Sequence, residues 1–189
     1  MELFEKALLF AADAHKGMIR KRAGTPYITH PMEVCVIASS ISVNEELLCA
    51  ALLHDTVEDT PVTAEDILRE FGERVAYLVS TETEDKRPDM PPWDSWEIRK
   101  KESLQVLANC NDRDVKILWL SDKLSNMRSF YRLHEEEGEK LWLNFHQPDP
   151  KKQGDYYREI ARLTEELSDT AAWKEYRYLL DEVFKGESE

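Results

Sequence analysis

The sequence lacks the features that mark three broad classes of protein. Its 189 residues contain no apolar run near the roughly 18 residues that a membrane span needs, and no signal-peptide pattern stands at its start. The only cysteines, Cys35, Cys49 and Cys110, lie far apart in apolar surroundings, which favours reduced core residues over a disulfide framework or zinc site. Basic residues are too few for a nucleic-acid-binding protein, since the formal net charge is -13. We therefore expect a cytoplasmic protein with no membrane or nucleic-acid partner, although a local basic cluster could hold a small phosphorylated ligand.

The alternation of apolar and polar residues that marks β-strands is also missing, as are repeats and low-complexity tracts. Apolar residues recur instead at helical spacing along most of the chain. The length and the composition, 42% hydrophobic and 33% charged, fit one globular domain with a substantial core. The sequence thus predicts an all-α fold in a single domain.

Periodicity and helix-boundary residues place the expected helices. They cover residues 2–16, His30 to about Ile41, Ser42 or Asn44 to His54, Thr63 to Phe71, 73–84, about 95–108, a long stretch through Val115 and Met127, about 155–167 and about 170–184. Ser42 with Glu45 has the spacing of a capping box, and Thr63 with Asp66 marks another helix start. Residues 85–94 hold three prolines and predict a loop, while residues 135–154 show no clear pattern.

The most informative run is HDTVED at residues 54–59, which ends an apolar segment. If this run is helical, His54 and Glu58 share one ridge, and Asp55 and Asp59 share the next. So many acids around an imidazole repel one another unless a cation lies among them. A metal site is therefore the simplest interpretation of this run.

Two other places supply candidate metal ligands, His30 at an expected helix start and Asp122 inside an apolar helix. An ionised aspartate in such a helix is costly to bury without a partner. Each signal has a plainer explanation when taken alone. Asp122 could be a surface acid beside Lys123, His30 a structural histidine, and Glu58-Asp59 a solvated helix end. The combination of three such places favours the metal site.

These motifs, in this order, resemble the HD superfamily of metal-dependent phosphohydrolases, and most closely the hydrolase domain of the RelA/SpoT family, which degrades the alarmones ppGpp and pppGpp. The matching motifs are AHKG at 14–17, GTPYITHP at 24–31, AALLHDTVEDT at 50–60, FG at 71–72 and LSDKLSNMR at 120–128. The chain stops where a synthetase domain would begin, so it resembles the stand-alone small alarmone hydrolases, including the animal type. The resemblance implies one HD-type domain over residues 1–189, with a motif-bearing core at about 2–132 and C-terminal helices at about 155–184. It also implies a metal site in a cleft between helices.

The resemblance further implies that one divalent metal ion is bound by His30, His54, Asp55 and Asp122. Two imidazoles and two carboxylates suit a mid-series cation such as Mn²⁺ better than Mg²⁺, which favours an all-oxygen shell. Glu58 and Asp59 match the pair that positions or deprotonates the attacking water. The expected reaction converts guanosine 3′,5′-bis(diphosphate) to GDP and pyrophosphate, or pppGpp to GTP and pyrophosphate.

Substrate contacts are expected from Arg20, Lys21, Arg22, Lys86, Asn126 and Tyr156. By resemblance, one basic residue of 20–22 stacks on guanine while a neighbour contacts phosphate, and the sequence leaves open which does which. Asn126 matches an asparagine that contacts the nucleotide sugar. Lys86, with Arg87 and residues 99–101, could reach the pyrophosphate or be ordinary surface charge, and Tyr156 could bind the nucleotide or pack in the core. His134 and His146 are expected to be bystanders.

Two alternatives stay open. The same metal site could serve another nucleotide, as in a nucleotide phosphatase or an NADPH 2′-phosphatase, and only the basic loop argues against this. Alternatively, the domain could bind alarmone without cutting it, although the sequence holds every expected ligand and the Glu-Asp pair. Residues 88–96 and 135–154 depart from the family pattern. Because residues 88–96 border the expected cleft, they bear on the choice of substrate.

Overall fold

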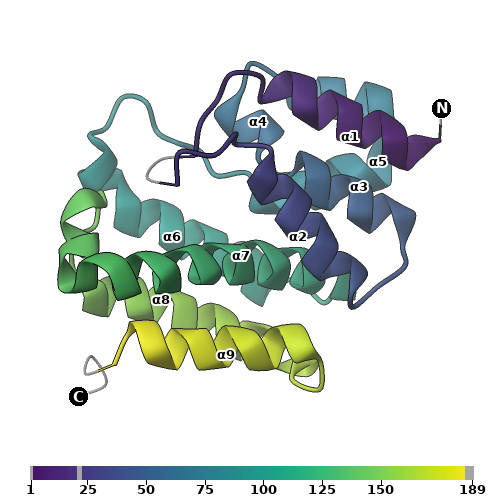
Figure 1. Ribbon diagram of the computed structural model, residues 1–189. Helices are drawn as coiled ribbons and strands as arrows, with labels where there is room; N and C mark the ends of the chain where they lie inside the picture. The colour runs from purple at the N-terminus through teal and green to yellow at the C-terminus, as the bar shows by residue number, and fades with distance from the viewer. Residues whose placement is uncertain (1, 21–22, 186–189) are drawn as a thin grey trace.

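Helices form the framework of the chain in a computed structural model, which describes residues 2–20 and 23–185 (Figure 1). In chain order they are α1 (Leu3–Ala14), α2 (Thr29–Ser39), α3 (Glu45–Leu53), α4 (Thr56–Asp59), α5 (Ala64–Glu82), α6 (Pro92–Ala108), α7 (Arg113–Glu137), the 3-10 helix η1 (Gly138–Asn144), α8 (Pro150–Leu163), the 3-10 helix η2 (Glu165–Leu167) and α9 (Ala171–Val183). The described residues include an isolated β-bridge between Ile19 and Pro26 but no strand. The predicted all-α fold is confirmed.

The long helix α7 runs through the middle of the fold (Figure 1). It packs against α2, α3 and α5 from the first half of the chain, and against η1, α8 and α9 from the second half. Its apolar residues between Val115 and Met127 are almost completely buried, with Ile117 at 2% exposure and Leu118, Leu120 and Leu124 at 0%. A polar side chain on the same stretch of α7, such as Asp122, is therefore carried into the protein interior.

Side-chain caps mark several helix starts, those of α3 and α5 among them. Thr63 and Asp66, which predict a helix start, form a capping box: Thr63 Oγ1 accepts the Asp66 N–H at 3.2 Å, and Asp66 Oδ2 accepts the Thr63 N–H at 3.0 Å. The box predicted at Ser42 is wrong, because α3 is capped by Asn44, whose Oδ1 accepts the Glu46 N–H at 3.1 Å. Ser42 Oγ accepts the Asn44 N–H instead, at 3.2 Å, and so supports the turn before the helix.

Two interruptions shape the helices that follow. The run from His54 to Asp59 is not one continuous helix, because α3 ends at Leu53 and α4 begins at Thr56. His54 and Asp55 form the turn between them, so the shared ridges expected of an unbroken helix do not apply. Gly72, at φ 84°, divides α5 where the sequence predicts an end and a new start. Glycine adopts this left-handed conformation without a steric penalty.

The segments that the sequence left without helices are partly helical. Helix α6 begins at Pro92, inside the predicted loop, because proline is tolerated in the first turn of a helix. In residues 135–154, α7 continues to Glu137, η1 follows, and α8 begins at Pro150 after the cap residue Asp149. None of the helices in ranges 2–20 and 23–185 combines the length and the apolarity that crossing a lipid bilayer requires.

The loop between α1 and α2 closes on itself through backbone hydrogen bonds. Arg20 N–H donates to Thr25 O at 2.8 Å, and Tyr27 N–H donates to Met18 O at 2.9 Å. These bonds fix Arg20 and Tyr27 beside the first turn of α2, where His30 lies.

Candidate metal centre

The predicted metal ligands lie at one helix start, in one turn between two helices and in one helix interior. His30 lies in the first turn of α2, and His54 and Asp55 form the turn between α3 and α4. Asp122 lies within α7, which packs against both α2 and α3. Helix packing therefore brings together residues that are far apart in the sequence.

The side chains of these four residues lie close together. His30 Nε2 lies 3.0 Å from Asp122 Oδ1 and 3.5 Å from Asp55 Oδ2. His54 Nε2 lies 3.2 Å from Asp55 Oδ2 and 3.7 Å from Asp122 Oδ1. Of these residues, His30, His54 and Asp122 form a group whose ligand atoms all lie within 4.8 Å of one another. Asp55 approaches both imidazoles but falls outside that group.

The imidazole of His54 is oriented to bind a cation. Its Nδ1 lies 2.9 Å from Ala51 O, and since a carbonyl only accepts hydrogen bonds, Nδ1 carries the proton. Nε2 then points to the carboxylates and makes no hydrogen bond within the described part of the chain. Burial lowers the pKa of His54, but Asp55 and Asp122 outweigh it and raise this pKa well above its usual value, so Nε2 also carries a proton when no cation is bound. A bound divalent cation would displace that proton and take its place between the nitrogen and the two carboxylates. The donor set of two imidazoles and two carboxylates fits a divalent metal ion.

Asp122 is buried, with 5% of its surface exposed, which excludes the surface-acid explanation. Its Oδ1 accepts a hydrogen bond from Asn126 Nδ2 at 2.9 Å, and its Oδ2 accepts one from Lys123 Nζ. Burial alone would raise the pKa of Asp122, but the Lys123 ammonium and the two histidines outweigh it and hold this pKa well below its usual range. Lys123 is anchored in turn on Glu82 Oε2 at 3.0 Å. Asp122 is thus held ionised with Oδ1 on the histidine side.

The predicted Glu-Asp pair borders this cluster and is only partly exposed, at 20% for the Glu58 side chain and 24% for Asp59. Burial raises the pKa of Glu58 to about 7, and its Oε2 accepts the Glu84 N–H at 3.2 Å. Asp59 is more tightly held, because its carboxylate contacts Lys86 Nζ and its Oδ2 accepts from the Tyr27 hydroxyl at 2.7 Å. The Glu58 carboxylate is therefore less constrained by its neighbours than the Asp59 carboxylate.

A cleft of about 480 Å³ opens over the cluster and places cations beside the acids. Arg99 Nη1 and Lys100 Nζ each lie 2.8 Å from Glu84. Arg20 Nη2 donates to Asn126 Oδ1 at 2.9 Å, so two predicted substrate contacts meet at the edge of the cleft. The cleft thus contains both the acids that a metal needs and the cations that phosphate groups need.

The other predicted substrate contacts that the structure describes do not line the cleft. Arg87 Nη2 lies 2.5 Å from Glu102 Oε1, and Lys21 and Arg22 lie outside the described residues. Tyr156 is 4% exposed in α8, where Lys100 Nζ lies 4.9 Å from its ring centroid, and it does not line the cleft.

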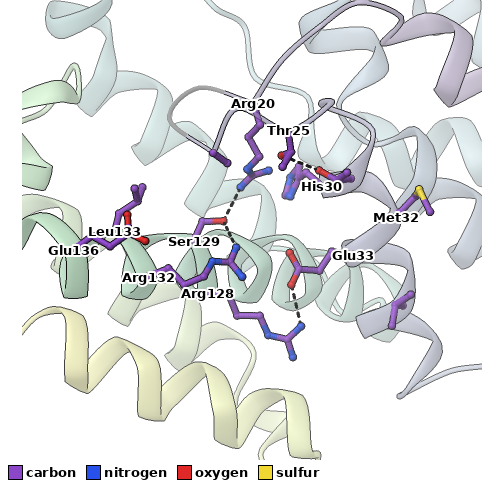
Figure 2. A pocket seen from close by; sticks show the side chains of 13 residues that line it. Arg20, Thr25, His30, Met32, Glu33, Arg128, Ser129, Arg132, Leu133 and Glu136 are labelled. Atoms are coloured by element: carbon purple, nitrogen blue, oxygen red, sulfur yellow. Dashed lines mark hydrogen bonds and ion pairs between the residues drawn. The ribbon is translucent and has the colours of Figure 1, made fainter.

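A second cavity, of about 830 Å³, adjoins the cleft and shares Arg20 and His30 with it (Figure 2). Arg128 and Arg132 also line it, and Figure 2 shows Arg132 and Arg20 converging on Ser129. This cavity gives the cleft an extension large enough for a nucleoside.

Sequence reasoning missed three residues of this site: Tyr27, Glu82 and Lys123. Tyr27 stands inside the GTPYITHP motif, and its hydroxyl lies 2.8 Å from Asp55 Oδ2 as well as close to Asp59. Lys123 directly follows Asp122, so its position was a usable signal. Nothing in the sequence marked Glu82, whose role depends on where α5 ends against α7.

Comparisons with known proteins agree with this geometry. A family model described as HD domain matches residues 7–145. Guanosine-3′,5′-bis(diphosphate) 3′-pyrophosphohydrolase of Aquifex aeolicus is 36% identical over 140 residues, which cover 74% of this chain and 19% of that protein. The bifunctional (p)ppGpp synthase/hydrolase SpoT of Escherichia coli is 32% identical over 190 residues, covering 95% of this chain and 26% of that protein.

A solved structure matches at a TM-score of 0.71 and 26% identity, covering 100% of this chain and 97% of the other. It is described as a metazoan ortholog of SpoT that hydrolyses ppGpp and plays a role in starvation responses. The chain spans only 19% to 26% of the length of the two curated relatives, so what it shares with them is one region. The HD domain match over residues 7–145 contains the four predicted ligands and the Glu-Asp pair, and the chain belongs to the HD domain family.

Proposed function

We propose that the protein is a metal-dependent phosphohydrolase that removes pyrophosphate from the 3′ position of ppGpp and pppGpp, leaving GDP and GTP. The observation that carries this proposal is the meeting of His30, His54 and Asp122, with Asp55 beside them, at the base of a cleft rich in cations. The names of the Aquifex protein and of the metazoan structure support the same reaction and substrate.

In this proposal His30, His54, Asp55 and Asp122 hold one divalent cation, and Mn²⁺ is the ion we expect. When bound, such a cation lowers the pKa of a coordinated water and polarises a phosphoryl oxygen. The protein's own contribution is to keep Asp122 ionised through Lys123 and to hold the Nδ1 proton of His54 on Ala51 O, so that Nε2 is the nitrogen that faces the metal site.

We assign the role of general base to Glu58 and a positioning role to Asp59. A base works best when its pKa is near the working pH, and burial brings the pKa of Glu58 to about 7. Asp59 is already engaged by Lys86 and by the Tyr27 hydroxyl, so it is better placed to orient its neighbours than to take up a proton.

The cations of the cleft suit the phosphate groups of the substrate. Arg99, Lys100 and Lys123 line the cleft, and Lys86 reaches the Glu58 and Asp59 carboxylates from its edge. Phosphoryl transfer builds negative charge on the equatorial oxygens, so fixed cations stabilise the transition state more than they stabilise free substrate. Lys86 can pass from the carboxylates to an arriving 3′-diphosphate.

The nucleoside fits the second cavity, which shares Arg20 with the cleft. The Arg20 guanidinium is held in place by Asn126 at 2.9 Å and Ser129 at 3.3 Å, and a planar guanidinium can stack on a base or bind phosphate. In this proposal Asn126 contacts the sugar. Residues 1–189 would act as one cytoplasmic HD-type domain, its C-terminal helices included.

The test is to incubate the purified protein and Mn²⁺ with ppGpp, pppGpp and NADPH in parallel and to separate the products by anion exchange. We expect GDP or GTP with stoichiometric pyrophosphate, and no products in chelator. Orthophosphate from NADPH or another nucleotide, with alarmone left intact, would favour the alternative phosphatase. Alarmone binding without turnover in Mn²⁺ would favour a non-catalytic binding domain.

A further inference from the structure

A chain of hydrogen bonds lies behind His30, on the opposite side of its ring from the metal centre. His30 Nδ1 lies 2.8 Å from the hydroxyl of Ser125, a fully buried residue of α7. Ser125 Oγ donates in turn to Glu33 Oε2 at 2.7 Å. Glu33 Oε1 accepts from Arg128 Nη1 at 3.1 Å, a contact drawn in Figure 2. The chain thus joins a proposed metal ligand to the wall of the second cavity.

The direction of each hydrogen bond follows from the groups involved. An ionised carboxylate only accepts, so the single hydrogen of the Ser125 hydroxyl points to Glu33. The hydroxyl oxygen must then accept from His30, which places the imidazole proton on Nδ1. Nε2, which lies 3.0 Å from Asp122 Oδ1, is left with its lone pair toward the other ligands.

We propose that Ser125 and Glu33 are positioning residues that lock His30 in the tautomer required for metal binding. This inference rests on the proposed metal site. Outer partners of this kind fix the tautomer and orientation of metal-binding histidines in many proteins. Here the partner is a neutral hydroxyl, and the carboxylate behind it gives that hydroxyl its direction.

The series of hydrogen bonds continues to the C-terminal part of the fold. Arg128 binds the Glu175 carboxylate through two nitrogens, with Nε at 2.6 Å and Nη2 at 2.7 Å. Glu175 belongs to α9, which packs along α7. Glu175 of α9 therefore orients Arg128, and Arg128 orients Glu33. Through these contacts α9 supports the orientation of His30.

Two variants separate this role from simple packing. Ser125→Ala removes the acceptor for the His30 Nδ1 proton and changes little volume. Glu33→Gln is isosteric but reverses the direction of the hydrogen bonds. The amide carbonyl would accept from Arg128, which leaves the amide NH₂ to donate to Ser125. The Ser125 hydroxyl would then point at His30 and favour the opposite tautomer. Ser121→Ala is the matched control, since Ser121 is equally buried on α7 and its hydroxyl donates to the Ile117 carbonyl of its own helix at 2.7 Å.

The experiment has two readouts that need no enzyme activity. Nitrogen NMR of the metal-free protein at about pH 8, where free imidazoles are neutral, reports the tautomer directly. We expect the proton of His30 on Nδ1 in the wild type and on Nε2 in Glu33→Gln. Titration calorimetry with Mn²⁺ should show affinity reduced about 10- to 100-fold in Ser125→Ala and Glu33→Gln. Ser121→Ala should bind as tightly as the wild type.

A wild-type His30 protonated on Nε2, or unchanged Mn²⁺ affinity in both folded variants, would overturn the inference. If the wild type binds no Mn²⁺ at all, the proposed function fails, while the NMR result still decides the direction of the hydrogen-bond chain. If Ser125→Ala does not fold, Glu33→Gln and the wild-type tautomer decide the question.

Discussion

Nε2 of His30 lies 3.0 Å from Oδ1 of Asp122, although the two residues come from the first turn of α2 and the middle of α7. Both atoms are buried, and in the tautomer that we infer for His30 both carry lone pairs. Two acceptors at hydrogen-bond distance repel each other unless a proton or a metal ion lies between them. This contact therefore ties the stability of the site to its cation.

Asp122→Asn should weaken Mn²⁺ binding and hydrolysis together by at least about 100-fold, the upper end of what outer partners alone contribute. The amide removes a negative charge from the ligand set while nearly keeping its shape. Calorimetry and alarmone turnover measure the two losses. Glu46→Gln, an exposed change on α3, serves as the control. Full activity in Asp122→Asn would contradict the assignment of this ligand.

Metal ion should also stabilise the fold. Mn²⁺ at 100 times its dissociation constant adds about 2.7 kcal/mol to the free energy of unfolding. For a chain of this size that raises the melting temperature by about 5–11 °C. Differential scanning calorimetry of the chelated and Mn²⁺-loaded protein measures the shift. Equal melting temperatures in the two samples would argue against a metal at this site. At the same Mn²⁺ concentration, Asp122→Asn should shift by less than about 2 °C.

Glu58→Gln should lower kcat by about 10²–10⁴-fold, the range for loss of a general base, and leave Mn²⁺ affinity within about twofold of the wild type. Asp59→Asn should lower kcat less, because Asp59 is held by Tyr27 and Lys86. The comparison needs single-turnover kinetics at saturating Mn²⁺, with the exposed Glu73→Gln as control. A larger loss of kcat in Asp59→Asn than in Glu58→Gln would make Asp59 the general base and Glu58 the positioning residue.

The pH dependence of kcat follows from the raised pKa of Glu58. A general base accepts a proton only when ionised, so activity is present above this pKa and is lost as pH falls through about 7. A bound cation lowers this pKa, which places the acid limb at or below that value. Rates measured at saturating Mn²⁺ should show the limb in the wild type and lose it in Glu58→Gln. An acid limb that is identical in the two proteins would mean that another group titrates.

Arg20→Ala should raise KM for ppGpp about tenfold with a smaller effect on kcat, because the guanidinium is proposed to contact the nucleotide rather than the reacting atoms. The control is Arg69→Ala, whose side chain is 64% exposed and pairs with Asp66 and Glu70 on its own helix. Steady-state kinetics on both variants decide the matter. An unchanged KM in Arg20→Ala would remove this residue from the substrate site.

Local signals carried most of what the sequence could predict. The helical spacing of the apolar residues of α7 showed a helix that would be buried, and an aspartate inside it pointed to a special environment. His54-Asp55 stood at the end of another apolar helix, as predicted, although the turn that follows Leu53 did not show in the periodicity. These motifs were readable because each depends on a few adjacent residues.

What the sequence could not predict depends on contacts between distant segments. The ion pair of Glu82 with Lys123 forms only because the end of α5 meets α7. Ser125 looked like any small residue on a helix, and its role appears only once Glu33 lies behind it. The choice of Asn44 over Ser42 as the cap of α3 depends on backbone angles, φ -68° and ψ 112° at Asn44, that the pattern of residue types does not encode.

The most direct test of the account is a crystal structure of the protein grown with Mn²⁺, with diffraction data collected at the manganese absorption edge. The account predicts one anomalous peak within bonding distance of His30 Nε2, His54 Nε2, Asp55 and Asp122 Oδ1. Crystals that contain Mn²⁺ at other positions but show no peak between these four side chains would contradict it.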